Sequence, residues 1–182
     1  SRNQTLQISA MIRPFSPRRG AQQTIEVLSR INQQVGSNLK IIVFGCDDSH
    51  LKQLDIPEGL NLENQGVIVR EQVADILKTS DLFIDMSTYQ AFGRTAIEAM
   101  ACGCGSIIPE KGGGSEYDWA GTAALPVPTD NPELASKLVL ELLHNDDYLN
   151  HLRERGIASA SQFSIEKASL SVQEVLLSTM GY

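Results

Sequence analysis

Short apolar segments alternate with longer segments of helical periodicity along almost the whole chain. The expected strands cover residues 6–12, 40–45, 60–64, 81–85, 105–109 and 123–127. The expected helices cover residues 21–34, 71–79, 95–102, 133–143, 147–159 and 164–180. Repeated strand–helix–strand units give a parallel sheet with helices packed on it. We therefore predict an α/β fold: a Rossmann-like parallel sheet of about six strands, with helices on both faces and a helical C-terminal tail.

The length of 182 residues suits one domain with its own core better than two. We expect this domain to cover residues 1–163, and the segment 164–182 to form a separate C-terminal helix. The chain has no initiator Met and reaches its first expected strand almost at once. We therefore expect it to be part of a longer protein.

Composition argues against several classes of function. The net charge of −7 disfavours general nucleic-acid binding, because proteins that bind phosphate backbones need a basic face. No apolar run approaches the roughly 20 residues of a membrane-spanning helix. The odd number of cysteines argues against a disulfide framework and favours a reducing compartment, so we expect a cytoplasmic protein. Cys102 and Cys104 have the wrong spacing for a redox motif or a zinc site, and we predict no metal.

The segment 87–105 carries the most chemical information. It follows an apolar run, turns at Gly93 and opens a helix. The first N–H groups of a helix have no intrahelical acceptor, and the helix dipole adds positive potential, so such a turn suits an anion. Arg94 adds a positive charge suited to phosphate. Glu98 is the one charged residue in an otherwise apolar stretch of this helix, which predicts a position at an exposed edge or in a pocket.

Other notable residues also follow expected strands. Arg13, Gly45 and the segment 110–116 each come directly after an apolar run, as does the segment 87–94. In parallel sheets the ligand site lies beyond the carboxyl ends of the strands. We therefore expect these residues to line one site at that edge of the sheet.

Several motifs occur in an order that points to one family. They are the basic–glycine pair Arg19-Gly20, a strand ending in Gly45, Asp81-Leu-Phe-Ile-Asp-Met-Ser87, Ala91-Phe-Gly-Arg-Thr-Ala-Ile-Glu-Ala-Met-Ala-Cys-Gly103, Gly113-Gly-Ser-Glu116 and a Pro-Glu-Leu-Ala helix start at 132–135. The chain resembles the C-terminal, nucleotide-sugar-binding half of a GT-B glycosyltransferase, of the retaining, family 4-like kind called glycosyl transferases group 1. The resemblance covers nearly the whole chain. Its central block is specific, unlike a lone glycine-rich loop.

Glu98 has two interpretations. The resemblance implies that its carboxylate holds the ribose hydroxyls of the donor nucleotide, and a carboxylate can accept two hydrogen bonds from a vicinal diol. The residues alone also allow a capping box, in which Thr95 caps the helix and Glu98 closes the box three positions later. The two roles can coexist.

The resemblance also implies a diphosphate site. Backbone N–H groups at the helix start would face the phosphates, from Phe92, Gly93, Arg94 and Thr95. Arg13 and Arg19 match positions where the family has an Arg and a Lys or Arg on the phosphates, and their charge would stabilise the departing nucleoside diphosphate. The alternative is that both are solvated loop charges, which is how we interpret Arg18.

Gln90 departs from the family pattern. The family usually has Glu at this position, where it reaches the hydroxyls of the donor sugar. A Gln still forms hydrogen bonds with a sugar, but it has no charge to offset a developing oxocarbenium ion. Either the donor tolerates an amide, or activity is reduced or absent. We predict that Gln90 contacts the sugar, and that Gly45 and Glu116 also lie near the donor.

The resemblance implies a hexosyltransferase that uses a nucleotide sugar, a glycan or lipid-linked acceptor, and no cofactor. The acceptor would bind to an N-terminal domain outside this chain, toward which the helix 164–182 would pack. That missing part would also bring the protein to the periphery of a membrane. The chain alone would bind nucleotide weakly and would not transfer sugar.

Three alternatives remain open from the sequence. They are a module of the same fold that has lost catalysis, a GT-B relative such as a nucleotide-sugar epimerase, and an unrelated Rossmann-like domain. Against a dinucleotide-binding domain, the first strand is followed by Arg13-Pro-Phe-Ser-Pro-Arg-Arg-Gly20, without Gly-x-Gly-x-x-Gly. The sequence has no Ser–His–Asp pattern that supports a hydrolase.

Overall fold

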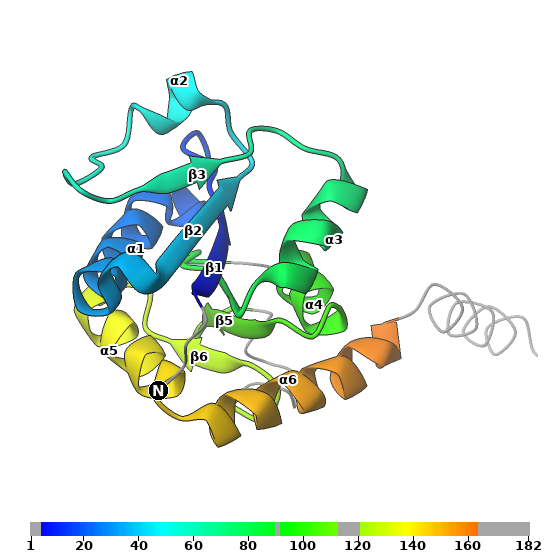
Figure 1. Ribbon diagram of the computed structural model, residues 1–182. Coiled ribbons are helices and arrows are strands. Elements are labelled where there is room, and N and C mark those ends of the chain that lie inside the picture. The colour runs from blue at the N-terminus through cyan, green and yellow to red at the C-terminus, as the bar shows by residue number, and fades with distance from the viewer. Residues whose placement is uncertain (1–4, 90–91, 113–120, 164–182) are drawn as a thin grey trace, which may run out of the picture.

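The computed structural model describes residues 5–89, 92–112 and 121–163, and every structural statement below concerns these residues. They form one six-stranded sheet in the order β3-β2-β1-β4-β5-β6, in which all neighbouring strands are parallel. Helices cover both faces of the sheet (Figure 1). The predicted Rossmann-like α/β fold is therefore confirmed.

The strands form where apolar residues run continuously. They are β1 (Leu6–Met11), β2 (Leu39–Phe44), β3 (Leu62–Asn64), β4 (Leu82–Ile84), β5 (Gly105–Pro109) and β6 (Leu125–Val127). Ile8, Phe83 and Ile107 are almost completely buried. Continuous apolar runs of this kind are typical of strands in a parallel sheet, because helices bury both of its faces.

Two pairs of helices pack on opposite sides of the sheet (Figure 1). The helices are α1 (Ala21–Val35), α2 (Asp48–Leu51), α3 (Arg70–Thr79), α4 (Arg94–Ala101), α5 (Pro132–Leu143) and α6 (Asp146–Ala160). α1 packs against α5 on one side of the sheet, and α3 packs against α4 on the other. α6 contacts α4, α5 and β5. Two hydrophobic cores result, one around Leu28 of α1 and one around Met100 of α4.

Helix α2 was not expected from the sequence. This helix is a single turn, too short to show a periodic pattern, and the side chain of Asp47 caps it by accepting a hydrogen bond from the backbone N of His50 over 3.0 Å. The expected loop after β1 contains a short 3-10 helix, Pro17–Arg19. The expected helix 164–180 lies outside the described residues. Among the described residues, no helix is both long and apolar enough to cross a membrane.

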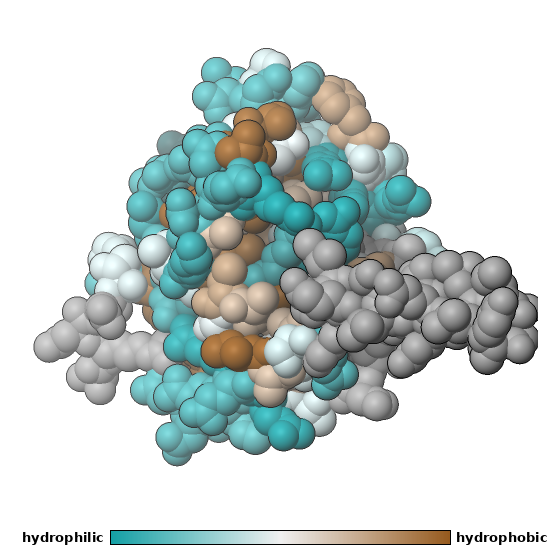
Figure 2. Space-filling view, turned by 90° about the vertical axis from the view of Figure 1, so that its right-hand side faces the viewer, coloured by the Kyte–Doolittle hydropathy of each residue, from teal (hydrophilic) through white to brown (hydrophobic). Residues whose placement is uncertain are grey.

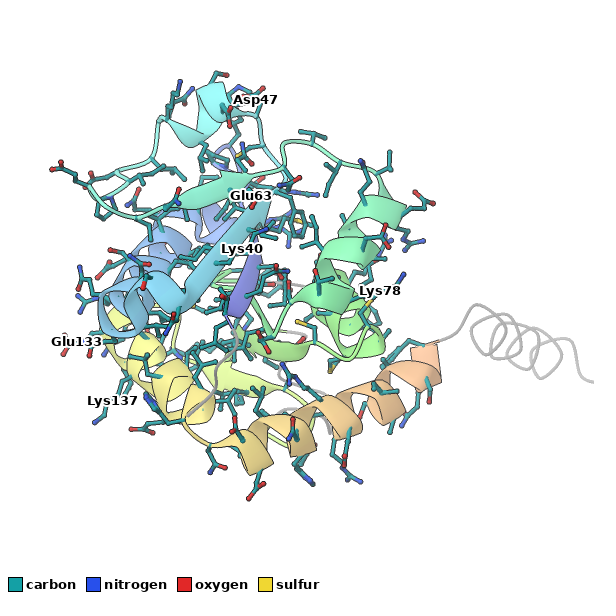
Figure 3. All side chains as sticks on the ribbon, in the orientation of Figure 1. Lys40, Asp47, Glu63, Lys78, Glu133 and Lys137 are labelled. Carbon is teal, nitrogen blue, oxygen red and sulfur yellow. The ribbon has the colours of Figure 1, made fainter. Side chains whose placement is uncertain are left out.

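The outermost strand pair on one side carries an exposed ion pair. Figure 3 labels Lys40 on β2 and Glu63 on β3, whose Nζ and Oε2 atoms are 2.9 Å apart. Hydrogen bonding from Lys40 lowers the pKa of Glu63. Both side chains are exposed, so this pair adds little to stability.

The order of the strands reverses between β1 and β4. From β1 the sheet continues outward to β2 and β3, and from β4 it continues in the opposite direction to β5 and β6. The loops that follow β1 and β4 therefore diverge at the carboxyl edge of the sheet. In open α/β sheets, a crevice at such a switch point is where ligands bind.

Gly20 brings these two loops into contact. It follows the 3-10 helix with a φ of 61° and a ψ of 40°, and α1 begins directly after it. A Cβ atom at this position would overlap the carbonyl oxygen of Met86. Nearby, the backbone N of Thr88 donates to the carbonyl oxygen of Arg18 over 2.8 Å. Glycine thus permits a close approach that fixes the β1–α1 loop against the β4–α4 loop.

We expect Gly20→Ala to lower the free energy of unfolding by about 3 kcal/mol, because the left-handed backbone costs about 1–2 kcal/mol and overpacking adds about 1–3 kcal/mol. Gly66→Ala is the matched control. Gly66 also has a positive φ, of 72°, but nothing lies within 4 Å of its Cβ position, so only the backbone cost applies. Urea unfolding of both variants measures the difference. Equal losses would contradict the close contact with Met86.

Candidate functional site

Two adjoining cavities open between the β1–α1 and β4–α4 loops. The larger, of about 350 Å³, is lined by Met11, Arg13, Arg19, Ile68, Arg70, Val73, Arg94, Thr95 and Glu98. The smaller, of about 190 Å³, is lined by Arg18, Arg19, Tyr89, Phe92, Gly93, Arg94 and Thr95. The cavities meet at Arg19, Arg94 and Thr95, which line both.

The start of α4 contributes to both cavities. Gly93 caps this helix with a φ of 72° and a ψ of 42°, a conformation that glycine adopts without strain. Arg94 and Thr95 are therefore the first helical residues, and the N–H groups at this end have no intrahelical acceptor. The capping box that the residues alone allowed for Thr95 and Glu98 does not form, because the cap is Gly93 and no side chain caps the helix. The helix start is left available to an anion.

Glu98 is held by two arginines. Its Oε1 atom lies 3.1 Å from Nη2 of Arg70 and 3.8 Å from Nη2 of Arg94. Its side chain is 32% exposed and lines the larger cavity. Arg70, the first residue of α3, lies 28 positions before Glu98 and was not expected from the sequence to join the site. A basic residue at a helix start on the carboxyl edge of the sheet is the signal that could have identified it.

Three arginines of the β1–α1 loop line the cavities. Arg13 and Arg19 line the larger cavity, and Arg18 and Arg19 line the smaller one. In the part of the chain that the structure describes, none of the three forms an ion pair. Unpaired positive charges gathered in this way favour an anionic ligand. Arg18, interpreted as a surface charge from the sequence, is exposed and lines the smaller cavity.

The remaining predicted residues are less informative. Gly45 has a φ of 105° and packs closely against the Ile12 carbonyl oxygen and the Met11 side chain, and it lines neither cavity. Gln90 and Glu116 lie outside the described residues. The site is thus built from the loops after β1 and β4 and from the starts of α3 and α4.

A buried carboxyl group lies close to Arg19. Asp85 directly follows β4, is 9% exposed, and accepts a hydrogen bond at Oδ1 from the backbone N of Ser87 over 2.9 Å. Burial raises the pKa of Asp85, while hydrogen bonds from Ser87 and the charge of Arg19 act in the opposite direction. Arg19 therefore lies near a buried carboxyl group and also lines both cavities.

The described cysteines do not resemble a metal site. Cys46 and Cys104 are buried, Cys102 is half-buried, and all three carry free thiols. Burial raises the pKa of each thiol and so disfavours the thiolate that binds metals. Among the described residues, no three His, Cys, Asp or Glu side chains lie together in a way that could hold a metal ion.

The family model described as "Glycosyl transferases group 1" matches residues 1–159. The chain belongs to this family. An uncharacterized glycosyltransferase of Methanocaldococcus jannaschii is 26% identical over 162 residues, which cover 88% of this chain and 45% of the relative. The N-acetyl-alpha-D-glucosaminyl L-malate synthase of Bacillus anthracis is 26% identical over 149 residues, which cover 80% and 39%. This group 1 chain thus spans less than half the length of these two relatives.

Solved structures of glycosyltransferases share the fold of the group 1 chain. Anabaena HepE, crystallised with UDP and glucose, superposes with a TM-score of 0.77 at 19% identity over 96% of this chain and 49% of HepE. The C-terminal domain of the group 1 protein LpcC from Francisella tularensis superposes with a TM-score of 0.69 at 17% identity, over 88% of this chain and 86% of that domain. The fold is therefore that of one half of a GT-B glycosyltransferase.

We expect Asp85→Asn to become relatively more stabilising as the pH rises. Because the folded-state pKa of Asp85 is raised, the folded group 1 chain binds this proton more tightly than the unfolded chain. Wild-type stability therefore falls as the pH rises from the unfolded pKa of about 3.9 through the folded pKa. Asn keeps the acceptor for Ser87 and has no proton to lose.

Urea unfolding of both proteins between about pH 4 and pH 7 measures this effect. The free energy of unfolding of the variant minus that of the wild type should increase across the range. A difference that does not change with pH would contradict the raised pKa.

Proposed function

We propose that this chain binds the donor substrate, a nucleoside diphosphate sugar, in a retaining glycosyltransferase. The observation that carries the proposal is one cavity that combines Arg13, Arg19, the start of α4 and the Glu98 carboxylate. Guanidinium groups and helix N–H groups bind phosphate oxygens, and a carboxylate binds a ribose diol. One ligand, a nucleoside diphosphate, satisfies both kinds of group.

In the proposed reaction the phosphates lie between Arg13, Arg19 and the N–H groups of Arg94 and Thr95. The bond between the anomeric carbon of the sugar and a diphosphate oxygen breaks, and negative charge collects on the departing diphosphate. Cations that already face this position stabilise the charge without reorganisation. The groups that bind the donor therefore also assist its departure.

Glu98 is available to the ribose despite its two arginine neighbours. Both contacts use Oε1, and Oε2 accepts no hydrogen bond from the described residues. The contact with Arg70 involves an exposed arginine, and such pairs contribute only about 0–1 kcal/mol. A vicinal diol can therefore bind Oε2, or replace Arg70, at little cost.

Transfer itself belongs to the whole protein in this proposal. The relatives are more than twice as long as the matched segment, and a preceding domain would bind a glycan or lipid-linked acceptor of the hexosyl group. The helix 164–182 would pack toward that domain. The free cysteines are consistent with a cytoplasmic protein, and contact with a membrane surface would come from the acceptor side.

A second candidate is a donor-binding module that no longer catalyses transfer. Gln90 favours it, because an amide cannot offset a developing positive charge on the sugar.

In the whole protein, we expect Gln90→Ala to lower turnover if Gln90 contacts the reacting sugar. Steady-state transfer assays measure the effect, and unchanged turnover would contradict that role.

The direct test of donor binding is an NMR titration of the 182-residue chain with UDP, GDP, ADP and dTDP. At least one nucleotide should shift the resonances of Arg13, Arg94 and Glu98. Affinity should fall steeply with added salt, because the phosphates contact several cations. No shift at these residues with any of the four nucleotides would contradict the proposed function.

For the nucleotide found to bind, we expect Glu98→Ala to raise the dissociation constant about tenfold. This factor corresponds to the loss of about 1.5 kcal/mol, the contribution of hydrogen bonds to a charged group. The 2′,3′-dideoxy form of the same nucleotide lacks the diol, so the variant and the wild type should bind it equally. Glu154→Ala is the control, since it removes an exposed acid of α6 outside both cavities. An equal loss for the dideoxy nucleotide would show that Glu98 does not bind ribose.

A further inference from the structure

The smaller cavity contains a cation, Arg18, that the proposed function does not use. Three of its lining residues are the arginines Arg18, Arg19 and Arg94, and two are the aromatic residues Tyr89 and Phe92. No carboxylate lines it among the described residues. A neutral hexose presents only hydroxyl groups, which neutral side chains can bind. This cavity instead suits a ring that carries negative charge.

The two cavities together hold more positive charge than a diphosphate matches. Five arginines line them, Arg13, Arg18, Arg19, Arg70 and Arg94. Four negative groups face them: Glu98 beside Arg70 and Arg94, Asp85 near Arg19, and the two phosphates of a nucleoside diphosphate sugar, with one negative charge each. One of the five positive charges is then unmatched among the described residues. Because the proposed function assigns Arg13 and Arg19 to the phosphates, that charge is Arg18.

The backbone of Arg18 is fixed beside the smaller cavity. Its carbonyl oxygen accepts a hydrogen bond from the backbone N of Thr88 over 2.8 Å and lies 3.3 Å from Oγ1 of the same residue. Its guanidinium takes part in no ion pair or hydrogen bond with the described residues. A cation on a fixed backbone loses less freedom when it binds an anion.

Tyr89 and Phe92 give the smaller cavity flat, partly exposed walls. Tyr89 is 57% exposed and Phe92 is 37% exposed. Phe92 packs edge-on against Phe163, with the ring centroids 5.6 Å apart. The apolar face of a sugar ring can lie on such aromatic surfaces. The volume of about 190 Å³ suits one ring rather than an extended chain.

Figure 2 shows one face of the whole molecule, on which apolar residues gather in small separate groups among hydrophilic ones.

The adjacent sequence agrees with an anionic ligand. Gln90 follows Tyr89, and the sequence analysis predicts that it contacts the donor sugar. An acid at that position would repel a carboxylate on the sugar, whereas an amide can donate a hydrogen bond to it. The residue that departs from the family pattern is thus compatible with the surplus of arginines.

We propose that the smaller cavity binds the donor sugar, that this sugar is a hexuronic acid, and that Arg18 recognises its carboxylate. A guanidinium matches a carboxylate with two parallel N–H···O hydrogen bonds. The inference rests on the proposed function, because it needs the diphosphate in the larger cavity. Arg18 is then a specificity-determining residue, and the phosphates depend on Arg13 and Arg19.

The test compares UDP-glucuronic acid with UDP-glucose, which differ in having a carboxylate or a hydroxymethyl group on the same ring. By NMR titration of the 182-residue chain, UDP-glucuronic acid should bind about five- to tenfold more tightly. Arg18→Gln should bring the ratio of the two dissociation constants close to one. Arg155→Gln is the matched control, since it removes one exposed positive charge of α6 outside both cavities, and should keep the ratio. If the nucleotide panel selects guanine, the pair becomes GDP-mannuronic acid and GDP-mannose.

The outcomes separate this inference from the proposed function. Equal affinity for the two sugars, with UDP itself bound, would overturn the inference and leave donor binding intact. If Arg18→Gln weakens UDP, UDP-glucose and UDP-glucuronic acid by the same factor, Arg18 contacts a phosphate and the inference is also overturned. If no nucleotide binds, the proposed function fails and takes the inference with it.

Discussion

The geometry of the site depends on the close backbone approach between Gly20 and Met86. Arg18 and Arg19 directly precede this contact, and α1 directly follows it. A shift of the contact would therefore move both arginines relative to the start of α4. Exposed ion pairs contribute too little to resist such a shift. Two backbone segments packed so closely that even a Cβ atom would overlap leave almost no room for adjustment. Packing of the main chain, rather than pairing of charges, sets the distances between the cationic groups.

An acidic chain can still bind an anion at this edge of the sheet. The net charge is −7, but at physiological salt charges more than about 8 Å away are largely screened. The arginines that line the two cavities act within that distance. The overall charge thus affects how fast an anionic ligand approaches, and the local cations decide where it binds.

The fold could be predicted from local patterns, but much of the site could not. Continuous apolar runs identify the strands, because burial on both faces leaves no alternation. The cap of α4 is Gly93, whose backbone is left-handed, and no side chain of the helix start takes that role from it. Arg70 meets Glu98 only because α3 and α4 pack side by side. Contacts of this kind depend on tertiary structure and leave no spacing signal in the sequence.

The position of Arg18 could also not be predicted from the sequence. In the sequence this residue is one of several charges in a loop rich in Pro and Arg, and the family resemblance assigns the neighbouring Arg19, rather than Arg18, to the phosphates. The 3-10 helix and the hydrogen bond from Thr88 turn its main chain toward the second loop. Its environment is defined by residues about 70 positions away, so its position beside the smaller cavity is visible only in the folded chain.

The two outer strands have a consequence for how this domain associates with others. Each has only three residues; β6 contains Pro126, which has no N–H to donate, and β3 carries Glu63 in an ion pair with Lys40. Short, charged or proline-containing edges are poor templates for an incoming strand. The two edges of this sheet therefore resist extension by a strand from another domain or from a second copy of the chain, and the six-stranded sheet is closed to further growth.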